Sequence, residues 1–125
     1  GLGDVYKRQN VASIGAFLPM RDTVVYGASK AFVQSFCSSL QEEVRGDNIR
    51  IQCLCPGMTR TEIHDTPMFE GFDKTRIPEE LWMDSVEVVD LSLAALEEDR
   101  VVVVTGETNV AMAKAAVQAT MDSIQ

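Results

Sequence analysis

The sequence is poor in several kinds of residue, and each shortage excludes a class of protein. Its 125 residues include 11 lysines and arginines against 19 aspartates and glutamates, which gives a net charge of -8. A nucleic-acid partner requires a basic face that neutralises phosphates, so this balance argues against one. No apolar run approaches the roughly 20 residues that cross a bilayer, so we expect no membrane partner either.

Cysteine and histidine are also scarce. The sequence has three cysteines, Cys37, Cys53 and Cys55, and a single histidine, His64. An odd number of cysteines indicates reduced thiols in a cytoplasmic protein rather than a disulfide framework. Cys53 and Cys55 alternate along an apolar run, which is more typical of small buried side chains than of zinc ligands, since no second pair has ligand spacing. We therefore predict no metal site.

The first nine residues, GLGDVYKRQ, show no apolar period. The stretch from Asp4 to Gln9 resembles a translated sequencing-library adapter. We therefore interpret residues 1–9 as non-biological, exclude them from the predicted fold, and expect the biological chain to extend upstream of Asn10. Residues 10–125 are then predicted to be the C-terminal part of a single domain.

Hydrophobic periodicity predicts alternating strands and helices over the rest of the chain. The expected elements, in chain order, are a strand end at 10–15, a helix over 26–45 that Gly46 ends, a strand over 49–55, a long loop over 58–80 with room for one short helix, a helix from Asp84 to about Asp99, a strand over 101–104 and an amphipathic helix after Gly106. Asp84 and Glu87 have the spacing of a capping box. Such alternation predicts an α/β fold with right-handed crossovers between parallel strands.

One short segment, YGASK at 26–30, places a phenol and an ammonium group together. Tyr26 and Lys30 are four residues apart, so they share one face of the predicted helix. A neighbouring positive charge favours the phenolate, which makes the phenol a better proton donor and acceptor near neutral pH. The small residues at 27, 28 and 31 leave room for a flat ligand. Alone, this pair is common on surface helices, so its context decides.

Two more segments follow predicted strands, at the sheet edge where open α/β folds bind ligands. NVASIG carries Ser13, thirteen residues before Tyr26, and CPGMTRT begins at the end of the 49–55 strand. These three motifs, in this order and spacing, closely resemble the short-chain dehydrogenase/reductase family over residues 10 to about 106. In that family a strand ending in Asn-Val-Ser-Ser precedes Tyr-x-Ala-Ser-Lys, and a later strand ends in Pro-Gly-x-x-x-Thr.

The resemblance implies a Rossmann-type doubly wound parallel sheet and an oxidoreductase that moves a hydride between nicotinamide and a carbonyl or alcohol carbon. The cofactor would be NADP or NAD, with NADP slightly favoured. Ser13 would orient the substrate oxygen, Tyr26 would be the acid/base, and Lys30 would tune the tyrosine and hold the cofactor ribose. The residues expected to contact the cofactor are Tyr26, Lys30, Pro56, Gly57, Met58, Thr59 and Thr61.

The family's glycine-rich phosphate loop, cofactor-selecting residue and helix asparagine would all lie upstream of Asn10. The resemblance therefore implies a C-terminal fragment without the N-terminal cofactor-anchoring half, and we expect that fragment to be inactive by itself. A non-catalytic dinucleotide-binding sensor on the same fold stays open as an alternative. Such a sensor has no need of a serine, a tyrosine and a lysine together.

Apolar residues around the motifs suggest the substrate and the assembly. Those directly after Ser13 favour a small or medium apolar ketone or alcohol, and they are Ile14, Phe17, Leu18 and Met20. The 26–45 helix carries Val33, Phe36 and Leu40 on one side and Phe32 on another, which is more apolar surface than one sheet face covers. We therefore expect a homodimer or homotetramer that pairs through this helix, as family members commonly do.

Overall fold

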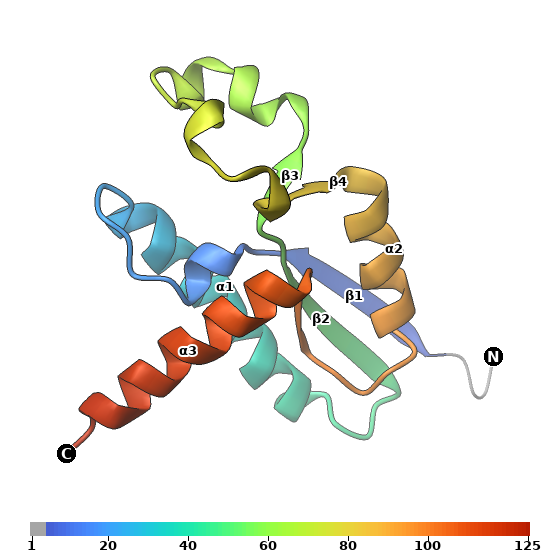
Figure 1. Ribbon diagram of the computed structural model, residues 1–125. Helices are drawn as coiled ribbons and strands as arrows, with labels where there is room; N and C mark the ends of the chain where they lie inside the picture. The colour runs from blue at the N-terminus through green and yellow to red at the C-terminus, as the bar shows by residue number, and fades with distance from the viewer. Residues whose placement is uncertain (1–4) are drawn as a thin grey trace.

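The main sheet has three parallel strands. A computed structural model describes residues 5–125, and in it β1 (Tyr6–Val11) and β5 (Val102–Val104) pair with the two edges of β2 (Ile49–Cys55). Two short strands, β3 (Met58–Arg60) and β4 (Trp82–Asp84), form a second parallel pair at the end of the main sheet, as Figure 1 shows. The predicted α/β fold with parallel strands is confirmed.

Helices cover both faces of β2, the central strand. One face packs against α1 (Val24–Glu43) in a core that contains Cys37, Cys53 and Cys55. The other face carries Leu54, which lies in a second core with residues of α2 (Ser85–Ala95). A third helix, α3 (Glu107–Ser123), follows β5 and ends beside the C-terminus (Figure 1). All five residues of 51–55 are buried, as expected for a strand covered on both faces.

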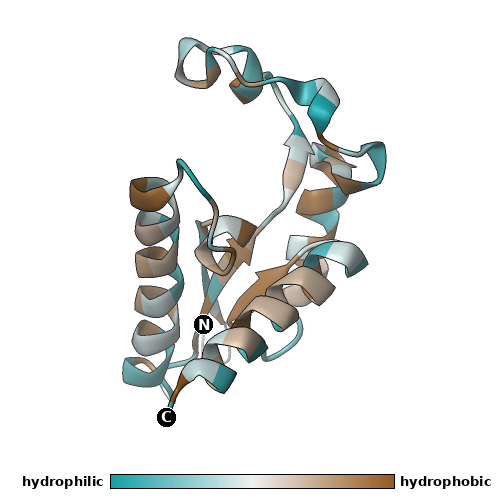
Figure 2. Cartoon of the chain, turned by 60° about the vertical axis from the view of Figure 1, so that its left-hand side comes forward, coloured by the Kyte–Doolittle hydropathy of each residue, from teal (hydrophilic) through white to brown (hydrophobic). Residues whose placement is uncertain are grey.

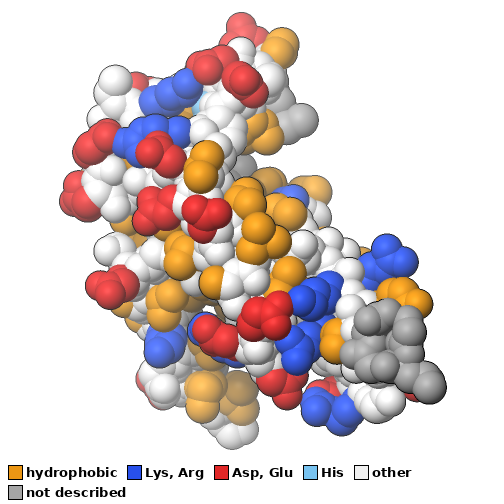
Figure 3. Space-filling model, turned by 90° about the vertical axis from the view of Figure 1, so that its right-hand side faces the viewer, with side chains coloured by type: hydrophobic (Ala, Val, Ile, Leu, Met, Phe, Trp, Pro, Cys, Tyr) orange, Lys and Arg blue, Asp and Glu red, His pale blue; other side chains and the backbone are white. Residues whose placement is uncertain are grey.

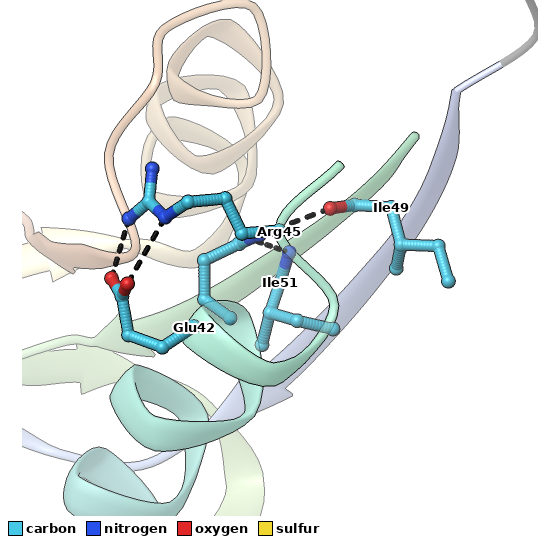
Figure 4. Close-up of polar contacts among 5 residues, drawn as sticks. Glu42, Arg45, Ile49 and Ile51 are labelled. Atoms are coloured by element: carbon cyan, nitrogen blue, oxygen red, sulfur yellow. Dashed lines mark hydrogen bonds and ion pairs between the residues drawn. The ribbon is translucent and has the colours of Figure 1, made fainter. Parts of the chain in front are cut away.

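Side-chain hydrogen bonds fasten the last turns of α1 to the start of β2. Gln41 donates to the carbonyl of Ile49 over 3.1 Å and accepts from the backbone N–H of Ile51 over 2.7 Å. Figure 4 shows the labelled backbone groups of these two strand residues, beside the ion pair between Glu42 and Arg45. One glutamine thus replaces the strand partner that the start of β2 lacks on this side.

The sequence boundaries are close to those observed for most elements. The strand predicted over 49–55 is confirmed residue for residue, and the helix predicted from 26 begins two residues earlier, at Val24. Gly46 has a φ of 95°, the left-handed conformation expected after a helix C-terminus. The capping box is wrong, because Asp84 precedes α2 without a side-chain hydrogen bond to it.

Tyr6–Gln9 belong to β1, although residues 1–9 were excluded from the predicted fold; that these nine residues are non-biological stays a prediction. Strand pairing uses backbone N–H and C=O groups, so a polar segment without apolar alternation still pairs with β2 from Tyr6 onward. Gln9 adds side-chain hydrogen bonds to Gln52 over 3.0 Å and to Ser92 over 2.8 Å, and both partners are buried. Residues 1–4 lie outside the described part of the chain.

The loop predicted over 58–80 has more structure than expected. It contains β3 and four 3₁₀ turns, Glu62–Asp65, Pro67–Phe69, Lys74–Arg76 and Glu79–Leu81, before β4 begins. We call residues 61–81 the lobe; in Figure 1 it projects from the top of the main sheet. Turns of three or four residues are too short to show a helical period in the sequence.

Apolar side chains remain on the outer surfaces of the helices. On α1, Val33 and Leu40 pack on the core as predicted, but Phe36 is 51% exposed and stacks with Phe32. Figure 2 shows that the first turn of α1 is hydrophobic. Figure 3 faces the side that carries α2 and shows hydrophobic side chains among acidic and basic ones. Within residues 5–125 no helix combines the length and the apolar character needed to cross a membrane.

Candidate active site

Ser13 lies just beyond the carboxyl end of β1. Its backbone is extended, and its hydroxyl oxygen accepts a hydrogen bond from the N–H of Gly15 over 3.0 Å, which caps the short turn Ile14–Ala16. The pairing with β2 continues past the strand, because the N–H of Ile14 donates to the carbonyl of Pro56 over 2.9 Å. Ser13 and the Pro56–Gly57 turn are therefore held side by side at one edge of the sheet.

Tyr26 reaches the same place from the first turn of α1. A Cβ built on Gly15 would lie 3.0 Å from Cε1 of the Tyr26 ring and 3.4 Å from Oγ of Ser13. The ring and the hydroxyl thus flank Gly15, which has no side chain. Tyr26 is 46% exposed, so the site is open to a ligand from solvent. The structure brings Ser13 and Tyr26 together, as the motif spacing predicts.

Lys30 completes the group one helical turn later. Its Nζ lies over the Tyr26 ring, 5.5 Å from the centroid, which is within the range of a cation–π contact. Ser29 does not join this group; its hydroxyl donates a hydrogen bond to the backbone carbonyl of Tyr26 over 2.7 Å. The face shared by positions 26 and 30 is therefore real, and it points toward the edge of the sheet that carries Ser13.

Some of the residues predicted to lie along the cofactor are next to Ser13, and the others lead away from it. Pro56 and Gly57 stand beside Ser13, and Thr59 donates from its hydroxyl to the Gly57 carbonyl over 3.2 Å. Met58 and Thr59 form β3, which leads away from the main sheet. Thr61 caps the first turn of the lobe and lines a separate hollow of about 590 Å³ that neither Ser13 nor Tyr26 lines.

His64 holds the lobe together. Its ring is packed among those of Phe69, Phe72 and Trp82, with centroids 5.0, 5.4 and 5.3 Å away. Burial among these rings, with a smaller effect of the nearby Lys74, holds the pKa of His64 below its usual 6.5. Its Nδ1 is buried without a hydrogen-bond partner in the described structure. A neutral imidazole fits this apolar packing.

The three cysteines are buried, free and part of the core, as predicted. Burial raises the pKa of Cys37 to about 11, with a smaller contribution from Cys53. The hydrogen bond with Cys55, followed by burial, raises the pKa of Cys53. Among residues 5–125 no cluster of three or more potential ligands could hold a metal ion. The thiols of Cys37 and Cys53 are therefore packing groups at neutral pH, whereas the hydrogen bond with Cys53 lowers the pKa of the buried Cys55.

Sequence reasoning missed two residues at this edge of the sheet. Gly15 separates Ser13 from Tyr26, and the only signal for it was its place two residues after the serine. Asn109, in the first turn of α3, is 4% exposed and lies against Gly57. No motif or spacing marked it, because an asparagine near the start of a helix is usually read as a polar surface residue.

Comparison with known proteins agrees with this geometry. Residues 9–68 match the model of the short chain dehydrogenase family. A short-chain dehydrogenase from Sphingobium yanoikuyae in complex with NADPH superposes with a TM-score of 0.68 at 27% identity, over 95% of this chain and 46% of that one. Over residues 9–68 the chain has the sequence of the short-chain dehydrogenase family, and over nearly its whole length it has the fold of a short-chain dehydrogenase. The Rossmann-type fold that the resemblance implied is confirmed with it.

Two further relatives show how much of this family the chain spans. An uncharacterized oxidoreductase of Staphylococcus epidermidis is 38% identical over 64 residues, which are 51% of this chain and 26% of that protein. The bulky-bulky ketone specific alcohol dehydrogenase from Comamonas testosteroni superposes with a TM-score of 0.62 at 26% identity, over 95% of this chain and 43% of that one. The match thus covers less than half the length of each of these relatives.

Proposed function

We propose that the whole protein carrying this chain is an NAD(P)-dependent oxidoreductase that interconverts a carbonyl and an alcohol. The observation that carries the proposal is that Ser13 and Tyr26 flank Gly15 while the Lys30 ammonium lies over the Tyr26 ring. A hydroxyl, a phenol and a cation converging at a ligand-binding sheet edge suit proton transfer to a substrate oxygen. The match of residues 9–68 to the short-chain dehydrogenases supports the same reaction class.

Each side chain has a role that its contacts allow. The Ser13 hydroxyl oxygen already accepts from Gly15, so its own O–H remains free to donate to the substrate oxygen. Tyr26, open to solvent, gives its phenolic proton to that oxygen in reduction and takes it back in oxidation. Lys30 stabilises the negative charge that the phenol develops, because its ammonium lies over the ring.

The residues present fit the nicotinamide half of a dinucleotide. Lys30 and Tyr26 offer donors for ribose hydroxyls, and the Pro56–Gly57 turn presents backbone next to Ser13. The cofactor, when bound, supplies or accepts the hydride. The Sphingobium relative was solved with NADPH, which supports NADP without deciding against NAD. We expect the pyrophosphate to be held on a glycine-rich turn outside residues 10–125, so this chain alone binds the cofactor weakly and is inactive.

The substrate class rests on fewer residues than the sequence suggested. Ile14 is 9% exposed and therefore has little surface to offer a substrate, whereas Phe17 is half-buried, packs on the α1-side core and lines a hollow of about 570 Å³ beside α3. Leu18 is half-buried and Met20 is exposed. A small or medium apolar ketone or alcohol remains the proposal, and the Comamonas relative, a bulky-bulky ketone specific alcohol dehydrogenase, supports the ketone class alone.

We expect the whole protein to be a homodimer or homotetramer that pairs through α1. Phe32 and Phe36 are 70% and 51% exposed and stack on each other with centroids 6.2 Å apart. In the first turn, Val24 and Val25 are 80% and 82% exposed. A second copy of the same helix is a self-complementary cover for such a stripe.

The test is a panel of ketones and alcohols offered to the whole protein with NADPH, NADH and their oxidised forms, followed by nicotinamide absorbance. Turnover of at least one apolar ketone or alcohol is expected. Ser13→Ala should lower kcat about 10²-fold, since it removes a donor to the developing oxyanion. The exposed Ser35→Ala on α1 is the matched control and should change nothing. No nicotinamide turnover by the intact protein would overturn the proposal.

A further inference from the structure

We propose that Asn109 is a positioning residue that fixes the Pro56–Gly57 turn against the sheet and so sets where the nicotinamide side of the cofactor lies. The inference rests on the proposed function and extends it to a residue more than 50 positions from the turn. Three observations carry it: the packing on Gly57, the fixation of Asn109 and the fixation of the turn.

The packing on Gly57 leaves no room for a side chain. A Cβ at this position would lie 2.3 Å from Nδ2 of Asn109 and 2.7 Å from both its Cγ and its Oδ1. The clash is with the whole carboxamide group rather than with the end of a flexible side chain. Glycine is therefore required here because Asn109 occupies the space that a Cβ would need.

Asn109 itself is held in place. It is 4% exposed, and its Nδ2 donates to the carbonyl of Thr105 over 2.8 Å, one helical turn before it. Gly106, at a φ of 87°, leaves Nδ2 only 3.3 Å from where its own Cβ would stand. The carboxamide is thus confined between two glycines at the carboxyl ends of β2 and β5, and it cannot rotate away without losing its hydrogen bond.

Two hydrogen bonds hold the Pro56–Gly57 turn on the sides that Asn109 does not contact. The Pro56 carbonyl accepts from Ile14, the residue after Ser13, over 2.9 Å, and the Gly57 carbonyl accepts from Thr59 over 3.2 Å. Asn109 supplies the packing surface behind the turn. Without it, these two hydrogen bonds leave the turn free to sink into the vacated space, which moves its backbone away from the ligand side.

The two glycines at this edge of the sheet, Gly15 and Gly57, are therefore required for different steric reasons. Gly15 has no side chain because the Tyr26 ring and the Ser13 hydroxyl meet there, and Gly57 has none because a protein amide lies behind it. The cofactor then meets the opposite, open face of the turn. Asn109 touches neither cofactor nor substrate in this account and acts only through the turn.

The experiment is a double-mutant cycle in the whole protein, with Asn109→Ala, Gly57→Ala and the pair together. Asn109→Ala should raise the KM for the cofactor about tenfold, the order expected for loss of one buried contact, while kcat changes little. Gly57→Ala should raise it further. The double variant should raise the cofactor KM by less than the product of the two single increases, because the added methyl group fills space that the carboxamide has left.

The exposed neighbour Thr108→Ala is the matched control and should leave both constants unchanged. Melting temperatures of the wild type, the two single variants and the double variant separate a loss of positioning from a loss of general stability. A stability loss with an unchanged cofactor KM in folded Asn109→Ala would overturn the proposal, as would additive effects in the pair. If the wild type turns over no nicotinamide at all, the proposed function fails instead, and the melting temperatures still test the Gly57–Asn109 contact.

Discussion

Gly15→Ala is the substitution whose effect the structure defines most closely. The glycine has no positive φ, so alanine suits its backbone and the perturbation is steric alone. The new methyl carbon would lie 3.0 Å from Cε1 of Tyr26, whereas two carbon atoms pack at about 3.5 to 4.0 Å. The tyrosine ring must therefore move by about 0.5 to 1 Å away from position 15, and so out of its place at the site.

A displacement of that size is expensive at a reacting centre. Misplacement by 1 Å costs about 10²-fold in rate, so we expect kcat to fall about 10- to 100-fold, or about 1.4 to 2.7 kcal/mol of transition-state stabilisation. The assay is nicotinamide absorbance under saturating substrate and cofactor, with far-UV circular dichroism to show that the variant is folded. Cofactor affinity should change much less than kcat.

Gly27→Ala is the matched control, one residue from the tyrosine. Its methyl carbon would stand 3.4 Å from the Gly15 carbonyl, an ordinary contact, and alanine is favoured over glycine in a helix by about 1 kcal/mol. This variant should keep its turnover and melt at a higher temperature. A folded Gly15→Ala variant with wild-type kcat would refute the reasoning that the close approach of Ser13 and Tyr26 matters for the reaction.

Three further predictions follow from the same structure. Lys30→Met in the whole protein should raise the cofactor KM and lower kcat together, and a loss confined to either constant would contradict its double role. Because the folded pKa of Cys37 is raised from 9.0 to about 11, its contribution to stability is complete below pH 9 and is lost as pH rises toward 11; denaturant unfolding across this range checks the loss, and rapid native-state labelling of Cys37 at pH 8 would contradict the burial. Phe32→Ser with Phe36→Ser should shift the whole protein toward monomer by light scattering, and an unchanged oligomer would exclude α1 as the interface.

The parts of the fold with strong side-chain patterns could be predicted from the sequence. The strand at 49–55 is apolar throughout because both its faces are buried, so its limits were recognisable. β1 was predicted only in part: the expected strand end at 10–15 includes its last two residues, whereas its polar residues at 6–9 pair through backbone groups that have no sequence signature. The lobe was misjudged for a related reason: its order comes from rings packed on His64 rather than from a repeating period.

The candidate site divides in the same way. Ser13, Tyr26 and Lys30 were predicted because their motifs, in this order and spacing, resemble those of the short-chain dehydrogenases, and the structure brings the three residues together at one edge. Gly15 and Asn109 act by shape and by contacts between distant segments. Their importance depends on which atoms the fold places 2 to 4 Å away, and no spacing along the chain encodes that.

Tyr26→Phe in the whole protein tests the central claim most directly, with turnover measured from pH 6 to 10 and cofactor affinity measured by reduced-nicotinamide fluorescence. The ring and its packing on Gly15 remain, and only the transferable proton is removed. The account predicts that turnover falls about 10²- to 10⁴-fold at every pH while cofactor affinity stays close to that of the wild type. Near-normal turnover across this pH range would contradict the assignment of Tyr26 as the acid/base.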